Sequence, residues 1–528
     1  MQYLRLALAS AVAASLLAAC SGTNPSSPVS GMSQMPSVLH NKLPKLLRIG
    51  HTPARPPRHT HAITSAIRQR AKAGGWTPLA AAAPFANGAG TEIQMTDGTI
   101  LVQDYCSPDW YPLIPDKTGS YVNGTWGPKT SMPSGYGPLY FASAILPDGK
   151  LIVQGGEYNF CGGAETNLGA IYDPVANAWT PVTGPTGWSE IGDGQSAVLA
   201  NGTYMLGNCC YTTQALLDEA SMSWTILSNN GKSGANSEEG WTLLRNGQLL
   251  DANVLDEPGS ELFNPKTNAW TSTGSLPQNL TQAEEIGPQT MMANNTVYVI
   301  GADQYTAIYN ANTGKWSQGP NNPVIGGTQY DAADAPTSLL PNGEGMIPES
   351  PGVYATPAQF FLFNGKKFKQ IANPPDAGND SSYNVRLLVL PTGQILEDDG
   401  SNDVEVYSAK RANVPVAGGK PQITSVAATL THGSTYKISG KRFNGLTQAN
   451  FYGDDDQQAS NYPLVRITNT GSGAVTFARS HAFSSMGIGS NKKVSAMFDV
   501  PATIQTGAST IQVVTNGIAS SPVSVTIQ

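Results

Sequence analysis

The chain has 528 residues, with 30 Lys and Arg against 37 Asp and Glu, a formal net charge of −7. Up to residue 73 it carries nine basic residues and no acidic one, which leaves 21 basic and 37 acidic residues, a formal charge of −16, for the rest. An acidic body argues against nucleic acid as a partner, because proteins bind phosphate backbones through Lys and Arg.

The first twenty residues have the pattern of a lipoprotein signal peptide. Arg5 is followed by a small, uncharged and mostly apolar run over residues 6–19 that ends directly before Cys20. The run is too short to span a membrane, and a Cys in this position is acylated once the signal is cleaved. We therefore expect an exported lipoprotein anchored in a membrane through Cys20, with Ser21 favouring the outer membrane or the cell surface. A plain signal peptide with an incidental Cys is the alternative.

Residues 21–73 are rich in Ser, Pro, Asn and basic residues and lack a sustained apolar period. This composition is typical of a flexible tether rather than of a packed domain. Because the tether is basic, we expect it either to contact anionic lipid or cell-wall polymer, or to be a solvated linker.

A strand-turn-strand unit recurs between residues 74 and 415. Its two-residue turns are Asp97-Gly98, Asp148-Gly149, Asn201-Gly202, Asn246-Gly247, Asn294-Asn295, Asn342-Gly343 and Thr392-Gly393. Successive turns are 45 to 53 residues apart, which is the length of one four-stranded propeller blade. Both residues of such turns are expected to have positive φ, as in type I′ hairpins.

These units predict an all-β fold, a seven-bladed kelch-like β-propeller over residues 74–415. The seventh unit lacks its last strand, and the segment Gly-Trp-Thr-Pro-Leu at residues 75–79 has the missing pattern. Pairing of the two ends closes the ring and removes exposed sheet edges. A stacked array of sandwiches is the alternative.

Polar residues stand nine or ten places before the second turn residue in six of the seven units. They are Tyr140, Asp193, Glu238, Glu285, Asp334 and Tyr383 with Asn384. We expect them to begin the innermost strands and to form a ring of carboxylates and phenols at one mouth of the channel. Clustered carboxylates raise one another's pKa values, hold a cation, or bind a polyhydroxylated ligand. For such a ligand, the candidate aromatic platforms are Tyr158, Trp110 and Tyr111. The alternative is that these residues are polar only because they contact water in the channel.

Four cysteines lie beyond Cys20, and each follows the second strand of one of the first three units. An exported protein permits disulfides. We expect Cys106 to pair with Cys161, which leaves Cys209 and Cys210 as a strained vicinal pair or as free thiols.

From residue 416 to 528 the turn spacing changes, and segments such as residues 435–440 and 508–514 alternate as half-buried strands do. This predicts an immunoglobulin-like or TIG-like β-sandwich. Asp454, Asp455 and Asp456 are expected either to face the channel or to form a solvated or calcium-type turn.

This order of parts resembles the galactose oxidase and glyoxal oxidase family of copper radical enzymes, over about residues 75–528. The resemblance implies that Tyr140 occupies the position of the copper-bound tyrosine and Tyr158 that of the stacking tryptophan. It also implies that Tyr383 and Asn384 stand in place of an axial tyrosine and a histidine ligand.

Three features of the family's copper site are missing. Asn384 replaces one histidine, and Ala89 and Thr91 stand where the cross-linked cysteine belongs. The sandwich loop that enters the propeller in the family, matched by residues 452–458, has no histidine. Four of the six histidines lie within residues 1–73, and only His432 and His481 lie further on. Because the radical site needs nitrogen ligands and a thioether, we expect neither copper nor another cofactor.

The sequence therefore favours a monomeric, non-catalytic surface protein that binds a glycan or a cell-envelope polysaccharide at the channel mouth. The alternatives are a copper radical oxidase of sugars or alcohols and a scaffold that binds other proteins. Glycoside hydrolysis by a pair such as Glu238 and Glu285 stays open, because the sequence does not give the distance between them.

Overall fold

The computed structural model describes residues 74–228, 230–410, 414–452 and 458–528. Cys20, the tether and Asp454 to Asp456 lie outside the described residues. The described part is all-β apart from one 3-10 turn, η2 (Ser382–Asn384). Among these residues no helix has the length and apolarity that a membrane crossing requires.

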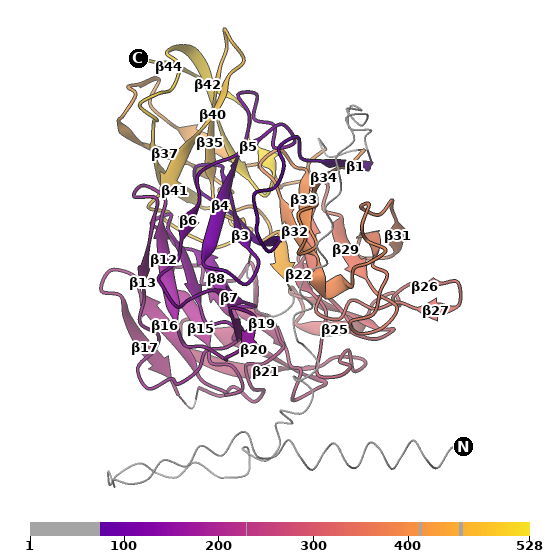
Figure 1. Cartoon of the computed structure of the whole chain (residues 1–528). Helices are drawn as coiled ribbons and strands as arrows, with labels where there is room; N and C mark the ends of the chain where they lie inside the picture. The colour runs from indigo at the N-terminus through magenta and orange to yellow at the C-terminus, as the bar shows by residue number, and fades with distance from the viewer. Residues whose placement is uncertain (1–73, 229, 411–413, 453–457) are drawn as a thin grey trace, which may run out of the picture. The chain divides into compact units, whose positions relative to one another are not determined.

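Most strands belong to antiparallel sheets whose members follow one another along the chain (Figure 1). The first three sheets are β2 (Ala89–Gln94), β3 (Ile100–Asp104), β4 (Asp109–Ile114) and β5 (Thr125–Trp126), with β6 (Thr130–Ser131) beside β4; β8 (Ala142–Ile145), β9 (Leu151–Gln154), β12 (Gly169–Asp173) and β13 (Ala178–Pro181); and β14 (Ser196–Val198), β15 (Tyr204–Gly207), β16 (Gln214–Asp218) and β17 (Ser223–Leu227).

The next three sheets repeat this order. They are β18 (Thr242–Leu243), β19 (Leu249–Ala252), β20 (Gly259–Asn264) and β21 (Ala269–Ser275); β22 (Gln289–Met291), β23 (Thr296–Ile300), β24 (Thr306–Asn310) and β25 (Lys315–Gln318); and β28 (Pro336–Leu339), β29 (Gly345–Glu349), β30 (Gln359–Phe363) and β31 (Phe368–Gln370). Two small sheets lie outside them: β7 (Pro138–Leu139) with β10 (Tyr158–Asn159) and β11 (Gly162–Gly163), and β26 (Val324–Ile325) with β27 (Thr328–Gln329).

The last of these meander sheets joins the two ends of the repeat region. It contains β32 (Arg386–Val389), β33 (Ile395–Asp398) and β34 (Val404–Ser408), and its outer strand is β1 (Gly75–Pro78). Trp76 pairs with Tyr407 across β1 and β34. First strands of neighbouring sheets pack together, with β8 beside β14, β18 beside β22, and β32 between β28 and β2. The arrangement is that of a β-propeller, in which such packing buries the inner edges.

The turns between the first two strands of each sheet share one geometry, which differs from the type I′ geometry expected from the sequence. In the first of them, the Gly98 N–H donates to the Met95 carbonyl and the Met95 N–H donates to the Thr99 carbonyl, at 3.0 and 2.8 Å. Gly98 has φ of 79°, but Asp97 is not among the residues with positive φ. This is a type I turn followed by a left-handed residue that forms a bulge. The Asp97 carboxylate accepts the Thr99 N–H at 3.0 Å, which favours Asp or Asn there.

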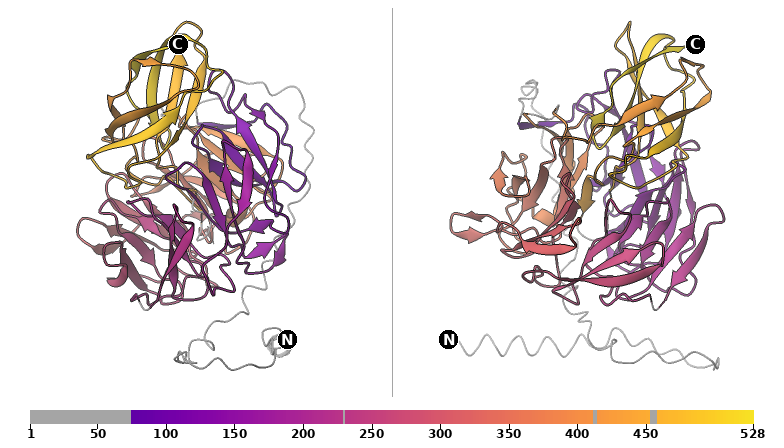
Figure 2. Two further views of the ribbon diagram at one scale, coloured as in Figure 1. Left: turned by 90° about the vertical axis from the view of Figure 1, so that its left-hand side faces the viewer. Right: turned by 180° about the vertical axis from the view of Figure 1, so that it is seen from behind.

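The C-terminal region forms a nine-stranded sheet (Figure 2), and its buried residues share one core with residues of the first two propeller sheets. Its strands are β35 (Gln422–Ser425), β37 (Thr435–Lys441), β41 (Lys493–Asp499), β40 (Val475–His481), β39 (Leu464–Asn469), β42 (Gly507–Thr515), β44 (Val523–Ile527) and β36 (Thr429–Leu430), with β43 (Ile518–Ala519) beside β42. Along β42 buried and partly exposed residues alternate, so Ile511 and Val513 face a core that also contains Phe498. That alternation is the reason the segment forms strands that pack on one face.

The C-terminal region contacts the propeller at the turn ends of the innermost strands. The Ser480 N–H donates to the Thr96 carbonyl at 3.1 Å, and the Phe483 N–H donates to the Pro147 carbonyl at 3.0 Å. A further strand, β38 (Asn450–Tyr452), leaves the C-terminal region and pairs with β28 on the side away from β29. The turn ends are thus covered, and the opposite ends of the innermost strands face away from this region.

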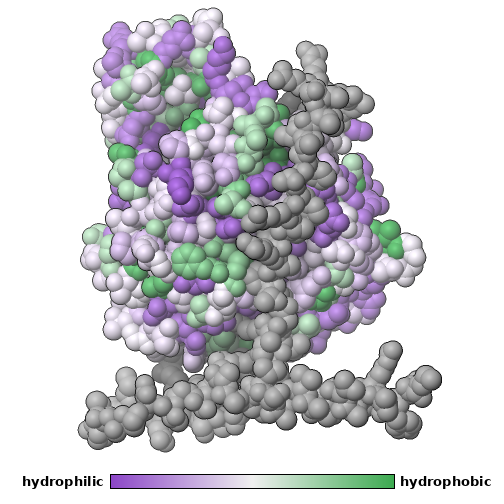
Figure 3. Space-filling model, viewed as in Figure 1, coloured by the Kyte–Doolittle hydropathy of each residue, from purple (hydrophilic) through white to green (hydrophobic). Residues whose placement is uncertain are grey.

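Large apolar side chains that remain exposed are few and scattered. Val175 is 71% exposed, Val324 62% and Phe160 50%, and they belong to different parts of the propeller. The face drawn in Figure 3 mixes hydrophilic and hydrophobic residues. Isolated exposed apolar residues are ordinary on folded proteins, so the candidate site must be sought among the buried polar groups.

Candidate functional site

The residues of the expected ring lie in the loops that lead into the innermost strands, and not within those strands as expected. They come two to four residues before the first residue of their strand, with Tyr383 and Asn384 in η2. These loops are at the end opposite to the turns that contact the C-terminal region. Ala89, the apolar member of the series, lies within β2 and is fully buried.

Several ring residues have a backbone conformation that L residues seldom adopt. Tyr140 has φ of 51°, Glu238 of 53° and Asp334 of 54°, at equivalent places in three different sheets. Tyr354, in the loop between β29 and β30, has φ of 59°. A left-handed non-glycine residue costs on the order of 1 kcal/mol and persists where surrounding structure imposes it. Its recurrence at one level of the propeller indicates that this level is built to hold particular side chains.

Tyr354 is the point at which three of the predicted carboxylates converge. Its hydroxyl donates a short hydrogen bond to Glu285 Oε1. Burial raises the pKa of Tyr354 far above its ordinary value, and the carboxylates of Glu285, Asp334 and Glu238 raise it further. These acids come from loops of three different sheets; Glu285 accepts a hydrogen bond from the phenol, and Asp334 and Glu238 act on it through their charge. Tyr354 carries no repeat signal, and sequence reasoning missed it.

Tyrosines form the other part of the site. The Tyr140 and Tyr158 ring centroids are 6.1 Å apart at 70°, because β10 pairs with β7 and sets Tyr158 opposite Leu139. The Tyr354 and Tyr383 rings meet edge to face at 5.1 Å and 81°. The pKa of Tyr383 is raised to about 12, mainly by burial and next by Tyr105 and Asp334, so its hydroxyl stays protonated at neutral pH.

A buried arginine links the two groups of tyrosines, and sequence reasoning missed it as well. The Arg386 guanidinium carbon lies 5.5 Å from the centroid of the Tyr140 ring, and its Nη1 donates to the Tyr383 carbonyl at 3.0 Å. Burial raises the pKa of Tyr105, while Arg386 and a hydrogen bond with Tyr140 oppose that rise. Cation–π contact of this kind stabilises a buried guanidinium. Arg386 begins β32, and no spacing rule distinguishes it from an ordinary strand residue.

The other predicted residues have different surroundings. Asn384 lies in η2, where its N–H donates to the Ser381 carbonyl at 3.0 Å. Asp193 is 98% buried and has Glu165 and Cys209 as neighbours. The prediction that Trp110 forms a platform for a ligand is wrong, because Trp110 is fully buried in the core against Trp179, with ring centroids 5.5 Å apart.

Tyr111 lies elsewhere too, with its ring against Phe85. A disulfide adjoins the tyrosines: it joins Cys106 and Cys161, the pair that the sequence favours, with Cα atoms 5.3 Å apart.

The donor set does not fit a copper radical centre. The side chains that converge are phenols and carboxylates, and residues 74–415 contain no histidine. His481 lies in the C-terminal region, where its Nε2 is 3.2 Å from Asp499 Oδ1 within the sheet. Thr91 and Ala89 offer no sulfur for a thioether. The chemistry of these donors suits hydrogen bonding and the binding of cations rather than the nitrogen coordination of copper.

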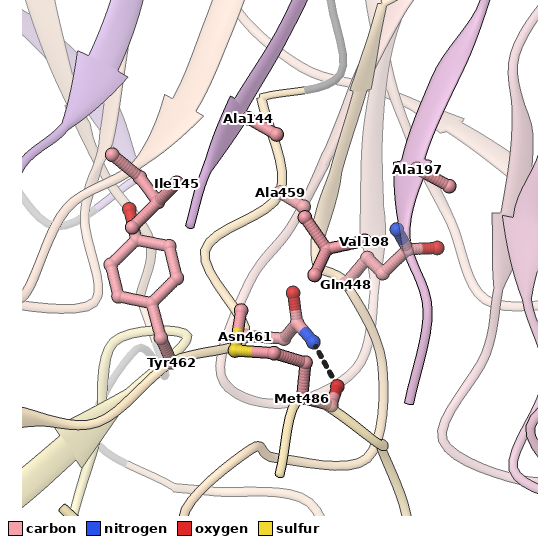
Figure 4. Close-up of a pocket in the computed structure, with 9 residues that line it drawn as sticks. All are labelled: Ala144, Ile145, Ala197, Val198, Gln448, Ala459, Asn461, Tyr462 and Met486. Carbon is pink, nitrogen blue, oxygen red and sulfur yellow. Dashed lines mark hydrogen bonds between the residues drawn. The ribbon is translucent and has the colours of Figure 1, made fainter. Parts of the chain in front are cut away.

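A small enclosed cavity lies elsewhere, between the inner strands β8 and β14 and the C-terminal region (Figure 4). Its volume is about 10 Å³, and Ala144, Val198 and Tyr462 are among its lining residues. Asn461 Nδ2 donates to the Met486 carbonyl at 2.9 Å beside it. The space suits at most one water molecule, so it is a packing gap and not a ligand site.

Comparison with known proteins gives a fold and no more. No family model and no curated protein matches the chain. A fungal alcohol oxidase of the AA5 family, solved in complex with copper, superposes with a TM-score of 0.51 at 13% identity, covering 87% of this chain and 100% of that one. The extracellular domain of a proposed one component system from B. thetaiotaomicron gives a TM-score of 0.41 at 10% identity, covering 87% of this chain and 56% of that one. The chain thus shares the β-propeller fold of that alcohol oxidase.

Proposed function

We propose that this protein is an exported, lipid-anchored, non-catalytic receptor that binds a glycan or a cell-envelope polysaccharide. In this proposal the seven meander sheets are the blades of one kelch-like propeller over residues 74–415. Residues 416–528 form an immunoglobulin-like sandwich that covers the turn face. Cys20 carries the lipid, and the ligand meets the face opposite the sandwich.

The observation that carries the proposal is the hydrogen bond from the Tyr354 hydroxyl to Glu285, beside which Asp334 and Glu238 act on the same phenol through their charge. A sugar presents several hydroxyls within a few ångströms, and carboxylates accept hydrogen bonds from such hydroxyls more strongly than neutral groups do. Tyr383, held protonated, supplies a donor beside these acceptors. Acceptors, donors and aromatic faces at one place are what recognition of a polyhydroxylated ligand requires.

The proposal excludes oxidation by a copper radical, because the residues near Tyr140 do not supply nitrogen ligands. If the purified protein takes up stoichiometric copper and makes peroxide from simple alcohols or sugars, the proposal is wrong.

Direct binding tests the ring itself. A glycan array would identify ligands, and calorimetry would then compare the wild-type protein with Glu285→Gln and Glu238→Gln. Each change removes one charged acceptor, a loss of about 1.5–3 kcal/mol, so affinity should fall by about 10-fold to 100-fold. Glu344→Gln is the matched control, because Glu344 lies in a turn at the opposite end of its sheet; it should leave affinity unchanged. If both ring variants bind the glycan as tightly as the wild-type protein, the ring is not the binding site.

A further inference from the structure

A second set of chemically active groups shares one residue, Asp193, with the predicted ring. One ligand atom from each of Glu165, Asp193 and Cys209 lies within 4.8 Å of the other two. Asp193 is 2% exposed and Cys209 is fully buried. Glu165 precedes β12, Asp193 precedes β14 and Cys209 follows β15, so two neighbouring sheets supply the three groups.

The backbone around these groups is arranged so that the three side chains can meet. A Cβ atom placed on Gly192 would lie 2.1 Å from Glu165 Oε2 and 3.0 Å from the Cys209 Cβ. Any larger residue at 192 would therefore push the Glu165 carboxylate out of the group. The Cys209 N–H donates to the Ile191 carbonyl at 3.1 Å, which ties the cysteine to the loop that carries Asp193.

The combination of two carboxylates and one thiolate favours one class of metal ion. Zn²⁺ and related borderline cations accept thiolate sulfur together with carboxylate oxygen, whereas Mg²⁺ and Ca²⁺ take oxygen ligands alone. Two carboxylates and one thiolate give three protein ligands, which leaves a position for water or for an oxygen of a bound ligand. Two acidic groups with one thiolate also offer three negative charges when deprotonated, enough to neutralise a divalent cation in a buried place.

The neighbouring cysteine makes this set of ligands dependent on redox state. Cys209 Sγ and Cys210 Sγ are 2.6 Å apart, and Cys210 has φ of 66°. Oxidation of the two thiols by an external disulfide forms one S–S bond and releases two protons, and the two electrons reduce the external disulfide to two thiols. The sulfur of Cys209 is then no longer a thiolate and cannot serve as a metal ligand.

We propose that Glu165, Asp193 and Cys209 form a site for a borderline divalent cation such as Zn²⁺, available only while Cys209 and Cys210 are reduced. The inference shares Asp193 with the predicted ring, but it does not require glycan binding. The site adjoins the ring, because Glu165 contributes, after burial and Glu157, to the raised pKa of Tyr158.

The test compares zinc uptake by the metal-free full-length protein with and without prior reduction by a phosphine. Reduced wild-type protein should bind one more Zn²⁺ per chain than reduced Cys209→Ser, measured by calorimetry. Taking the difference cancels any zinc held by the histidines at positions 40, 51, 59 and 61, which both proteins share. Loss of a residue that only hydrogen-bonds to a metal ligand weakens metal binding by roughly 10-fold to 100-fold. Loss of the ligand itself, in Cys209→Ser, should weaken zinc binding by more than this, and Asp193→Asn should weaken it likewise. Cobalt should give a sulfur-to-metal charge-transfer band in reduced wild-type protein that is absent in Cys209→Ser.

Cys210→Ser is the matched control for the redox step, because it keeps the proposed ligand and cannot form the vicinal disulfide. It should bind the extra zinc with or without reduction, whereas wild-type protein should bind it only after reduction. Equal zinc stoichiometry and affinity in reduced wild-type and Cys209→Ser proteins would overturn the site. Zinc uptake by wild-type protein that is the same before and after reduction would overturn the redox dependence.

Discussion

A single buried lysine shows how strongly this propeller relies on charges in its interior. Lys232 Nζ lies 2.6 Å from Asp251, 2.7 Å from Glu239 and 3.1 Å from Glu261, and 5.1 Å from the centroid of the Trp270 ring. Burial opposes the charge on Lys232, but the three carboxylates hold its pKa above the ordinary value. The lysine follows a glycine and precedes a serine, a pattern that resembles part of a phosphate loop, yet here its ammonium is one counter-charge shared by three buried acids.

Removing this cation should destabilise the protein severely. Lys232→Met leaves three buried carboxylates without a counter-charge, and loss of one partner of a buried ion cluster costs about 3–5 kcal/mol. Lys129→Met is the matched control, because Lys129 Nζ is also 2.6 Å from a carboxylate, that of Asp109, but its side chain is 53% exposed. Loss of that surface pair should cost less than about 1 kcal/mol. Urea unfolding of the two variants measures both values, and similar losses would contradict the argument.

At the scale of elements, the sheet of β32, β33 and β34 carries an unusual concentration of buried acids. Glu397 on β33 pairs directly with Glu405 on β34, and they are 1% and 2% exposed. Burial, then Asp403 and Asp399, raises the pKa of Glu405 to about 9. Asp380 lies in the loop before η2, and its pKa is also raised to about 9, first by burial and then by Asp399. Like charges directly opposite one another in a sheet are destabilising, so this sheet is held together best when the acids are protonated.

The stability of this sheet should therefore fall as the pH rises. In the unfolded chain these carboxyls titrate near pH 4, while Glu405 and Asp380 keep their protons to about pH 9 in the folded state. Between these limits the folded state binds more protons, so the free energy of unfolding decreases with pH. Each group contributes at most about 1.4 kcal/mol per pH unit, which gives an upper limit of about 4 kcal/mol per group between pH 5.5 and 8.5.

Urea midpoints at the two pH values measure this loss. Glu405→Gln should flatten the dependence, because the amide cannot titrate. Asp116→Asn is the control: hydrogen bonds from Thr118 and Ser120 lower the pKa of Asp116, so it titrates below this window. A wild-type midpoint that stays constant from pH 5.5 to 8.5 would contradict the raised pKa values.

The sequence predicted the hairpins well, because the residues that determine a turn are neighbours along the chain. The turn residues marked the hairpins because Gly98 and its equivalents hold a positive φ. The turn type was wrong because the dipeptide does not distinguish a two-residue type I′ turn from a type I turn with a bulge. The ring series located Glu238, Glu285 and Asp334 because they stand nine or ten residues before the second residue of a turn. Tyr354 and Arg386 join them only through folding, and no spacing marks them.

At the scale of the whole molecule, the C-terminal region completes the interior of the propeller. The Asn450 side-chain oxygen on β38 accepts hydrogen bonds from Ser338 Oγ at 2.6 Å and from the Val389 N–H at 2.9 Å. The Gln448 side-chain oxygen accepts the Leu243 N–H at 2.8 Å. These contacts satisfy one hydroxyl and two backbone N–H groups of innermost strands from three sheets, and buried donors of this kind need partners. Residue patterns alone gave no sign of them, because the partners are more than 60 residues apart; only the family resemblance pointed to a segment that enters the propeller.

The closure of the propeller by β1 is the feature on which the whole arrangement depends most directly. Without residues 75–79, β34 becomes an exposed edge, and the ring of Trp76 no longer packs on Phe360 and Tyr407 at 5.3 and 5.1 Å. An unprotected edge strand pairs with other chains. A chain that begins at residue 80 should therefore unfold at a lower temperature than one that begins at residue 74, and it should form dimers or aggregates in size-exclusion chromatography. Both truncated chains lack the tether, so the comparison isolates the strand. Equal unfolding temperatures and a monomeric shorter chain would mean that β1 does not close the propeller.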